Sequence, residues 1–133
     1  MSAIDASKTQ SEQTPRPIFV YGSLLNDEVF ARVLQGAKPE KRIDKSILKG
    51  FKRCQVRGAP YPAAIKSLES SEIVGGLLYL SDFQQLTKLD AFESDLYRRE
   101  TVDVLVAQDK GICLIESDVY IWNQDISRLE ERD

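Results

Sequence analysis

Two short segments of the chain carry groups that could do chemistry, and the first of them is a turn. Tyr21-Gly22-Ser23-Leu24 follows a run of β-forming residues and precedes a helical pattern. Glycine lets a ligand approach the backbone closely, and the start of a helix offers N–H groups without intrahelical acceptors. The turn could therefore hold a carboxylate or a developing oxyanion. The common alternative is an ordinary strand–turn–helix connection that binds nothing.

The second segment is a cluster of acidic residues where an amphipathic helix is predicted to end. Glu93 is expected near the C-terminus of that helix, and Asp90 lies within one turn of it. The negative end of the helix dipole and the charge of Asp90 both disfavour ionisation of Glu93. Partial burial would raise its pKa further toward neutrality, which suits a general acid or base. The alternative is a solvated acidic loop paired with Arg98 or Arg99.

Composition narrows the chemistry that is available. The 133 residues contain no histidine, which excludes a Ser-His-Asp triad, a Cys-His dyad and histidine metal ligands. Cys54 and Cys113 alone cannot form a four-thiolate zinc site, and the glycine-rich signatures of nucleotide-binding loops are missing. An enzyme of this composition must carry protons on Asp, Glu, Lys, Tyr or Cys, and we expect neither a cofactor nor a metal.

Charge and hydropathy indicate the partners and the compartment. Lysine and arginine number 18 against 21 aspartates and glutamates, and this net charge of −3 argues against a general nucleic-acid binder. The longest apolar stretch, 73–80, is far shorter than the roughly 20 residues that span a membrane. The N-terminus lacks the pattern of a signal peptide, and two widely separated cysteines are typical of reduced thiols. We therefore expect a cytoplasmic protein without a membrane partner.

The segment 38–57 is an exception to this charge balance, because only Glu40 and Asp44 oppose its basic residues. Two interpretations stay open, an anion or RNA surface and the solvated face of a strand and loop, and we favour the second. Phe51 is the single aromatic residue of the segment, which is too little for stacking on bases. The basic residues are Lys38, Lys41, Arg42, Lys45, Lys49, Lys52, Arg53 and Arg57.

The chain is predicted to consist of a flexible N-terminal tail, 1–15, and one domain, 16–133. The domain begins with a buried strand at 18–21. A helix follows, which Asn26 can cap and which ends near Gly36.

The middle of the domain reads mainly as strands. Loose alternation predicts a half-solvated strand at 47–56, and two prolines make 59–63 an edge or a loop. The next strand, 73–80, contains Gly75-Gly76, which indicates a bulge or a close backbone approach.

The last part of the domain begins with a second helix, which Ser81 is predicted to cap with Gln84 completing a capping box. The apolar face of this helix comprises Phe83, Leu86, Leu89 and Phe92. Further strands are predicted at 102–106, 112–115 and 119–122, and a short charged helix at 126–133. About six short strands and two or three helices without regular alternation favour an α+β fold with a mixed sheet or a small barrel.

Four motifs follow one another along the chain between residues 17 and 123. They are Phe19-Val20-Tyr21-Gly22-Ser23-Leu24, Tyr61-Pro62-Ala63, Leu89-Asp90-x-Phe92-Glu93 and Tyr97-x-Arg99-x-x-Val102-x-Val104. In this order and spacing, the chain resembles the γ-glutamylcyclotransferase-like family. Tyr120-x-Trp122 near the end is similar to the avirulence-induced (AIG2-like) branch of that family.

The resemblance implies a small mixed β-barrel flanked by helices and a cofactor-free reaction. In that reaction the α-amine of a γ-glutamyl compound attacks its own γ-carbonyl, which gives 5-oxoproline and releases an amine. Glu93 matches the catalytic glutamate of the family, which takes a proton from the substrate ammonium and passes one to the leaving amine. Tyr21, Gly22, Ser23 and Leu24 match the loop that holds the γ-glutamyl group. Tyr97 matches a tyrosine that lines the pocket.

The predicted function is therefore a γ-glutamyl cyclotransferase that acts on a γ-glutamyl amino acid, amine or peptide such as glutathione. The alternative is a non-catalytic module on the same fold that binds small carboxylates or acts in a stress response, because a fold by itself does not establish an activity.

Overall fold

The computed structural model describes residues 14–67 and 70–131, and in this part of the chain it contains eight strands and two α-helices. Five strands close into a barrel in the order β1 (Ile18–Val20), β5 (Glu72–Tyr79), β2 (Lys41–Lys49), β6 (Tyr97–Gln108) and β7 (Gly111–Trp122). A second sheet has the order β4 (Pro62–Lys66), β3 (Phe51–Val56) and β8 (Leu129–Glu131). The predicted α+β fold with a small mixed barrel is confirmed, although the strands outnumber the six expected.

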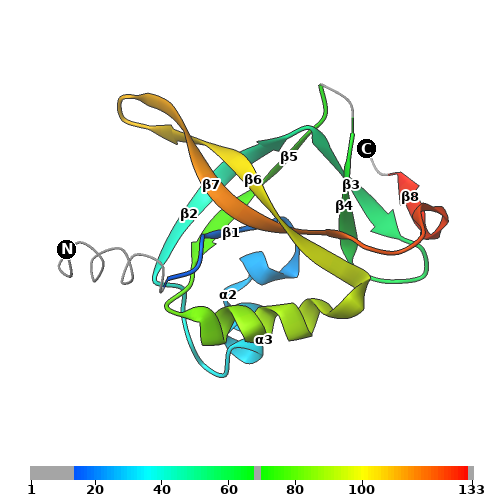
Figure 1. Ribbon diagram of the computed structural model, residues 1–133, viewed down its shortest axis with the longest axis horizontal. Coiled ribbons are helices and arrows are strands. Elements are labelled where there is room, and N and C mark those ends of the chain that lie inside the picture. Colours follow the sequence, from blue (N-terminus) through cyan, green and yellow to red (C-terminus); the bar gives the residue numbers. More distant parts are fainter. Residues whose placement is uncertain (1–13, 68–69, 132–133) are drawn as a thin grey trace, which may run out of the picture.

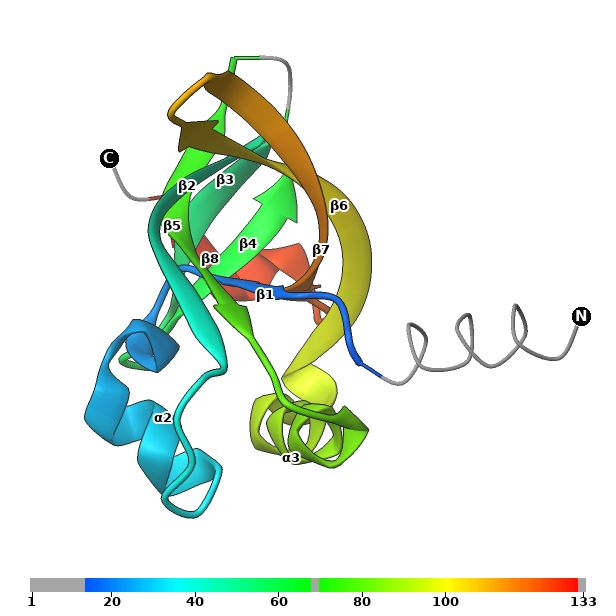
Figure 2. The ribbon, with the colours of Figure 1, turned by 90° about the vertical axis from the view of Figure 1, so that its left-hand side faces the viewer.

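The helices α2 (Asp27–Val33) and α3 (Phe83–Glu93) lie at one end of the barrel, opposite the tip of the β6–β7 hairpin (Figure 1, Figure 2). The barrel is mixed because β1 pairs antiparallel with β5 and parallel with β7. The expected flexible tail, 1–15, lies outside the described residues except for its last two positions.

The first strand and helix form as their sequences predict. All three residues of β1 are buried. The Asn26 side chain caps α2 by accepting hydrogen bonds from the backbone N–H groups of Glu28 at 2.8 Å and Val29 at 3.3 Å. Between the two elements, the chain makes a short 3-10 turn over Ser23–Leu25.

The strand predicted at 47–56 is wrong, because the chain turns in its middle. Gly50 adopts a φ of +84°, which glycine reaches without strain, and this turn separates β2 from β3. The two strands then enter different sheets, so that Leu48 is buried in one core cluster and Cys54 in another. The segment 59–63, predicted as an edge or loop, leads into β4 at the edge of the second sheet.

Helix α3 begins one residue later than predicted. Asp82, not Ser81, is the N-cap, since its side chain accepts a hydrogen bond from the Gln85 N–H at 3.0 Å. The Gln85 side chain accepts in turn from the Ser81 N–H at 2.8 Å, one residue before the N-cap, so the predicted capping box does not form and a related pair of hydrogen bonds takes its place. The apolar face is also narrower than predicted, because Leu86 and Leu89 are buried whereas Phe83 and Phe92 are exposed.

Two separate strands were expected at 112–115 and 119–122, but β7 is continuous. The polar residues Ser117 and Asp118, which interrupt the apolar pattern, are buried inside the strand and hydrogen-bonded there. The helix predicted at 126–133 is a 3-10 turn, Ile126–Arg128, followed by β8, because 129–131 pair with β3.

Gly75, on β5, allows this strand to approach β1, the shortest strand of the barrel, closely. A Cβ atom at this position would lie 2.9 Å from the Phe19 ring and would also meet the backbone oxygen of Val20. The register of β2 against β5 shifts between Ile43 and Ser46, opposite this point. The close backbone approach predicted from the paired glycines is therefore confirmed.

We expect Gly75→Ala to lower the free energy of unfolding by about 1–3 kcal/mol or more, since β1 must move away from β5. Val74→Ala is the matched control, because the Val74 side chain is largely exposed and its truncation should cost less than about 1 kcal/mol. Urea unfolding measures both variants. Equal effects of the two substitutions would contradict the close approach.

Candidate functional site

A cavity of about 280 Å³ opens where the end of β1, the start of β4, the end of α3 and the start of β6 meet. All the residues that the sequence predicted for the site line this one cavity. They are Tyr21, Gly22, Ser23, Leu24, Glu93 and Tyr97. The fold thus brings the glycine-containing turn and the acidic end of the second helix together, although the two segments are far apart in the chain.

The 21–24 loop forms one wall and presents backbone donors. Gly22 O accepts from the N–H of Leu25 at 3.0 Å, and Ser23 O accepts from the N–H of Asn26 at 2.9 Å. The N–H groups of Ser23 and Leu24 open this 3-10 turn and therefore have no acceptor within it. Gly22 lies so close to the β4 side that a Cβ atom would be 3.2 Å from Pro62 Cγ.

Tyr21 ties the loop to two other strands. Its hydroxyl donates to the backbone oxygen of Tyr120 at 2.7 Å and accepts from the N–H of Ala64 at 3.1 Å. Its own backbone oxygen accepts from Arg53 Nε at 3.2 Å. Burial, together with the nearby Tyr97 and Glu93, raises the pKa of the Tyr21 hydroxyl, so this phenol stays protonated at neutral pH. Tyr21 is therefore a fixed, uncharged side chain in the wall of the cavity.

Glu93 is the last residue of α3 and lines the cavity. Burial raises its pKa from 4.5 to about 7, and the negative charge of Asp90 contributes to the same shift. The predicted rise toward neutrality is therefore confirmed, and burial is its larger cause. At neutral pH, Glu93 can both accept and release a proton.

The end of α3 places Glu93 and Tyr97 close together. The helix stops because Ser94 adopts a φ of +63°, and the Ser94 N–H closes the last turn on the backbone oxygen of Asp90. A single 3-10 turn, Ser94–Leu96, then leads directly into β6 at Tyr97. Buried Leu89 anchors the helix in the core.

Tyr97 connects the start of β6 to β4 and β7. Its hydroxyl donates to the backbone oxygen of Pro62 at 2.6 Å, and its ring meets Trp122 edge-on at 5.6 Å between centroids. Burial, followed by the charge of Glu93, raises the pKa of the hydroxyl. Like Tyr21, this residue presents an uncharged wall to the cavity.

The alternative of a solvated acidic loop describes Asp90 but not Glu93. Arg99 forms a two-point contact with Asp90, and Arg98 pairs with Glu100. Glu93 lines the cavity, whereas Asp90, one helical turn earlier, forms the ion pair with Arg99.

Sequence reasoning about the site missed several lining residues. Phe92 was assigned to the buried face of the helix, but it is 48% exposed and borders the cavity. Tyr61 and Pro62 face the loop from the β4 side, and Tyr120 contributes from β7. The motifs Tyr61-Pro62-Ala63 and Tyr120-x-Trp122 were the available signals, yet only the folded barrel shows that both reach the same cavity.

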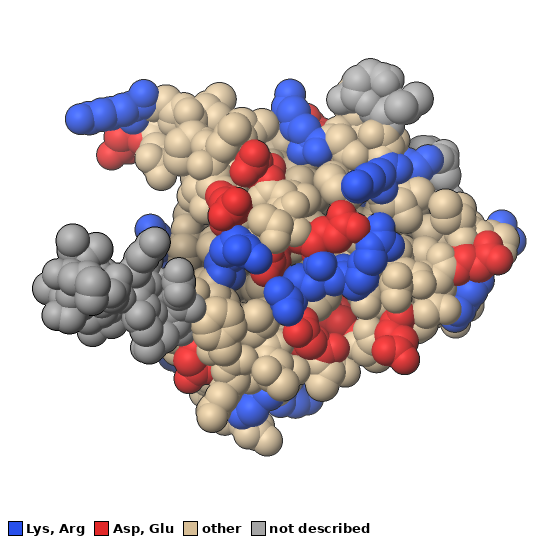
Figure 3. All heavy atoms as spheres, viewed as in Figure 1, with Lys and Arg blue, Asp and Glu red and all other residues tan. Residues whose placement is uncertain are grey.

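The described residues also bear on the other sequence predictions. They contain no group of three or more metal-ligating side chains and no helix long and apolar enough to cross a membrane. In the basic segment 38–57, Arg42 pairs with Asp27 and Asp44, and Lys41 lies over the Tyr79 ring. On the face seen in Figure 3, basic and acidic side chains are interspersed.

Comparisons with known proteins agree with this geometry. A family model described as gamma-glutamyl cyclotransferase, AIG2-like, matches residues 18–133. AIG2-like protein D of Arabidopsis thaliana is 34% identical over 109 residues, which are 82% of this chain and 68% of that protein. A solution structure from the same plant has 30% identity and a TM-score of 0.72, covering 91% of this chain and 70% of that one. A structure named gamma-glutamyl cyclotransferase shares the fold at 20% identity, with a TM-score of 0.65 over 86% of this chain and 68% of that one.

The raised pKa of Glu93 predicts a pH-dependent stability. The unfolded chain loses this proton near pH 4.5 and the folded protein only near 7, so ionisation of Glu93 lowers the free energy of unfolding across that interval. Glu93→Gln removes the effect. The stability of the variant relative to wild type should therefore increase by about 2 kcal/mol between about pH 4 and about pH 8, after allowance for partial exposure. Urea unfolding at both pH values measures it, and a constant difference would contradict the assigned pKa.

Proposed function

The chain belongs to the AIG2-like γ-glutamyl cyclotransferase family, and on this premise we propose that its cavity converts a γ-glutamyl compound into 5-oxoproline with release of an amine. The substrate would be a γ-glutamyl amino acid, amine or peptide. One observation carries the proposal: Glu93, whose pKa burial raises to about 7, lines the same cavity of about 280 Å³ as the 21–24 loop, whose Ser23 and Leu24 N–H groups have no acceptor within their own turn.

The reaction is an internal rearrangement of the substrate. The α-ammonium loses a proton, and its nitrogen attacks the γ-carbonyl carbon to form a five-membered ring. The bond from that carbon to the leaving nitrogen then breaks. The ring nitrogen gives up a second proton to become the amide N–H of 5-oxoproline, and the leaving nitrogen takes up both protons and departs as an ammonium ion. Because nucleophile and electrophile belong to one molecule, the protein mainly has to hold the substrate in a folded, attacking shape.

Glu93 would move the proton in both steps. An ordinary glutamate is too weak a base to deprotonate an ammonium group efficiently, whereas a carboxylate with a pKa of about 7 is better matched. Once protonated, the same carboxyl group is the acid that donates to the leaving amine. The free enzyme is restored without a second acid or base.

The 21–24 loop would bind the developing negative charge. The N–H groups of Ser23 and Leu24 are free of acceptors within their own turn, so they can donate to the γ-carbonyl oxygen as it becomes an oxyanion. Tyr21, Tyr97 and Phe92 line the same space with aromatic rings, which offer the methylene groups of a γ-glutamyl chain an apolar surface.

The direct test is release of 5-oxoproline from a panel of γ-glutamyl amino acids, γ-glutamyl amines and glutathione, followed by mass spectrometry. We expect Glu93→Gln to lower the turnover by about 10²–10⁴-fold, since it keeps the shape and removes the proton carrier. Glu100→Gln is the matched control, because Glu100 lies on β6 in an ion pair with Arg98, and it should keep full activity.

Each outcome of this test has a definite meaning. Turnover that survives in Glu93→Gln would overturn the role of Glu93 and keep the reaction. No turnover on any substrate, together with ligand-induced increases in melting temperature, would replace the cyclotransferase with the binding module.

Gly22→Ala tests the loop separately from the proton carrier. The added Cβ would press on Pro62 and displace the backbone donors, so we expect kcat/KM to fall by roughly 10–100-fold, mainly through a higher KM. The φ of −140° and ψ of −139° of Gly22 lie outside the regions that L-residues ordinarily adopt, so we also expect the free energy of unfolding to fall by about 1–3 kcal/mol, and KM is measured on the folded variant. An unchanged KM would show that this loop does not bind the substrate.

A further inference from the structure

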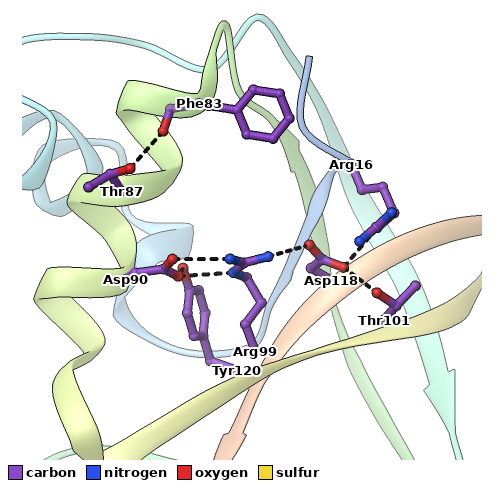
Figure 4. Close-up of polar contacts among 8 residues, drawn as sticks. All are labelled: Arg16, Phe83, Thr87, Asp90, Arg99, Thr101, Asp118 and Tyr120. Carbon is purple, nitrogen blue, oxygen red and sulfur yellow. Dashed lines mark hydrogen bonds and ion pairs between the residues drawn. The ribbon is translucent and has the colours of Figure 1, made fainter. Parts of the chain in front are cut away.

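A chain of alternating charges runs from the segment before β1 to the last turn of α3 (Figure 4). Arg16 Nε lies 3.0 Å from one oxygen of Asp118, and Arg99 Nη1 lies 3.0 Å from the other. Arg99 then reaches Asp90 with two further nitrogens, at 3.0 and 3.1 Å. The order is therefore cation, anion, cation, anion, and the final anion stands three residues before Glu93.

Asp118 anchors this chain in the barrel. It is only 2% exposed, and besides the two arginines it accepts from the Thr101 hydroxyl at 2.9 Å. Its backbone N–H donates to the oxygen of Pro17 at 2.9 Å. A buried carboxylate is tolerated when its oxygens are paired in this way. Arg99, on β6, is consequently held by the barrel itself.

Asp90 is held just as firmly at the other end. Both of its oxygens bind Arg99, and one of them also accepts from the Tyr120 hydroxyl at 2.6 Å. Burial opposes its charge, but the hydrogen bonds from Arg99 and Tyr120 and the charge of Arg99 outweigh burial and lower its pKa. Tyr120 also lines the cavity, so Asp90 is hydrogen-bonded to a residue of the wall that Glu93 shares.

Besides Asp90, the titratable groups around Glu93 are four tyrosines and two arginines. Burial is the largest cause of the raised pKa values of Tyr21, Tyr97 and Tyr120, which remain protonated phenols. The titratable groups that line the cavity or belong to the hydrogen-bond networks of its lining residues are Tyr21 after β1, Arg53 from β3, Tyr61 before β4, Asp90 on α3, Tyr97 and Arg99 from β6, and Tyr120 from β7. Arg53 binds the backbone of the loop, and Arg99 binds the two aspartates.

We propose that Asp90 is a positioning residue for the reaction: Arg99 and Tyr120 fix its carboxylate as a permanent negative charge that lets Glu93 keep the proton taken from the substrate ammonium. This inference rests on the proposed cyclotransferase function. The proton must stay on Glu93 while the ring forms and must leave it only when the departing amine needs it. A negative charge one helical turn away increases the affinity of Glu93 for this proton, although it does not contact the substrate.

The first measurement follows the carboxyl carbons of the ligand-free wild-type protein by NMR as the pH is changed. We expect Glu93 to titrate with a midpoint of about 7, while Asp90 stays ionised through that whole range. An Asp90 that takes up its proton before Glu93 does would overturn the proposal. This result needs no variant and does not depend on turnover.

The second measurement uses Asp90→Asn, which keeps the shape and removes the charge. We expect the midpoint of Glu93 to fall, the acidic limb of the kcat/KM profile to move to lower pH with it, and kcat to fall by about threefold or more with little change in KM. Asp90→Glu should restore the higher midpoint, and Glu100→Gln, which removes a charge on β6 and not on α3, should leave it unchanged.

The outcomes separate this inference from the function on which it rests. An unchanged Glu93 midpoint in folded Asp90→Asn, in a protein that releases 5-oxoproline, would overturn the role of Asp90 and leave the function standing. A shifted midpoint in a protein that turns over no γ-glutamyl substrate would overturn the function, and the positioning role with it. A shift that Asp90→Glu reverses in an active enzyme supports both.

Discussion

Arg99 binds two carboxylates at once, and this attachment of helix α3 to the barrel is the contact on which the pocket depends. On one side the guanidinium holds Asp90 near the end of α3, and on the other it holds Asp118, which the barrel buries. The interaction that satisfies a buried anion therefore also fixes the last turn of the helix. Glu93, which ends that turn, is held against the cavity as a result.

The electrostatics of the cavity follow from the same arrangement. Burial disfavours a charge on Glu93, and the compensated but still negative Asp90 disfavours it further, which brings the pKa to about 7. The tyrosines of the walls keep their protons because they too are buried. A site with one proton-exchanging group, uncharged walls and backbone donors in the 21–24 loop suits a reaction in which an amine must lose a proton and another must gain one.

Local signals predicted those elements whose ends are decided within a few residues. The Asn26 cap and the paired glycines of β5 are of this kind, because capping and close approach are properties of the residues themselves. The predictions were wrong where the end of a strand depends on the other strands with which it pairs. Gly50 separates two sheets, and Asp118 continues a strand that its polarity suggested would stop. Neither outcome can be predicted from the neighbouring residues, because the strands that pair come from distant parts of the chain.

By itself, the sequence determined which groups are available for chemistry: no histidine, a carboxyl group at the end of an amphipathic helix, and a glycine turn before another helix. It also limited the direction in which the pKa of Glu93 could move, because Asp90 and the helix end act within one turn. Only the tertiary structure decided that the turn and Glu93 share a cavity, and that Arg99 forms an ion pair with Asp90. Burial and ion pairing depend on distances between segments far apart in the chain, and those distances exist only once the barrel has closed.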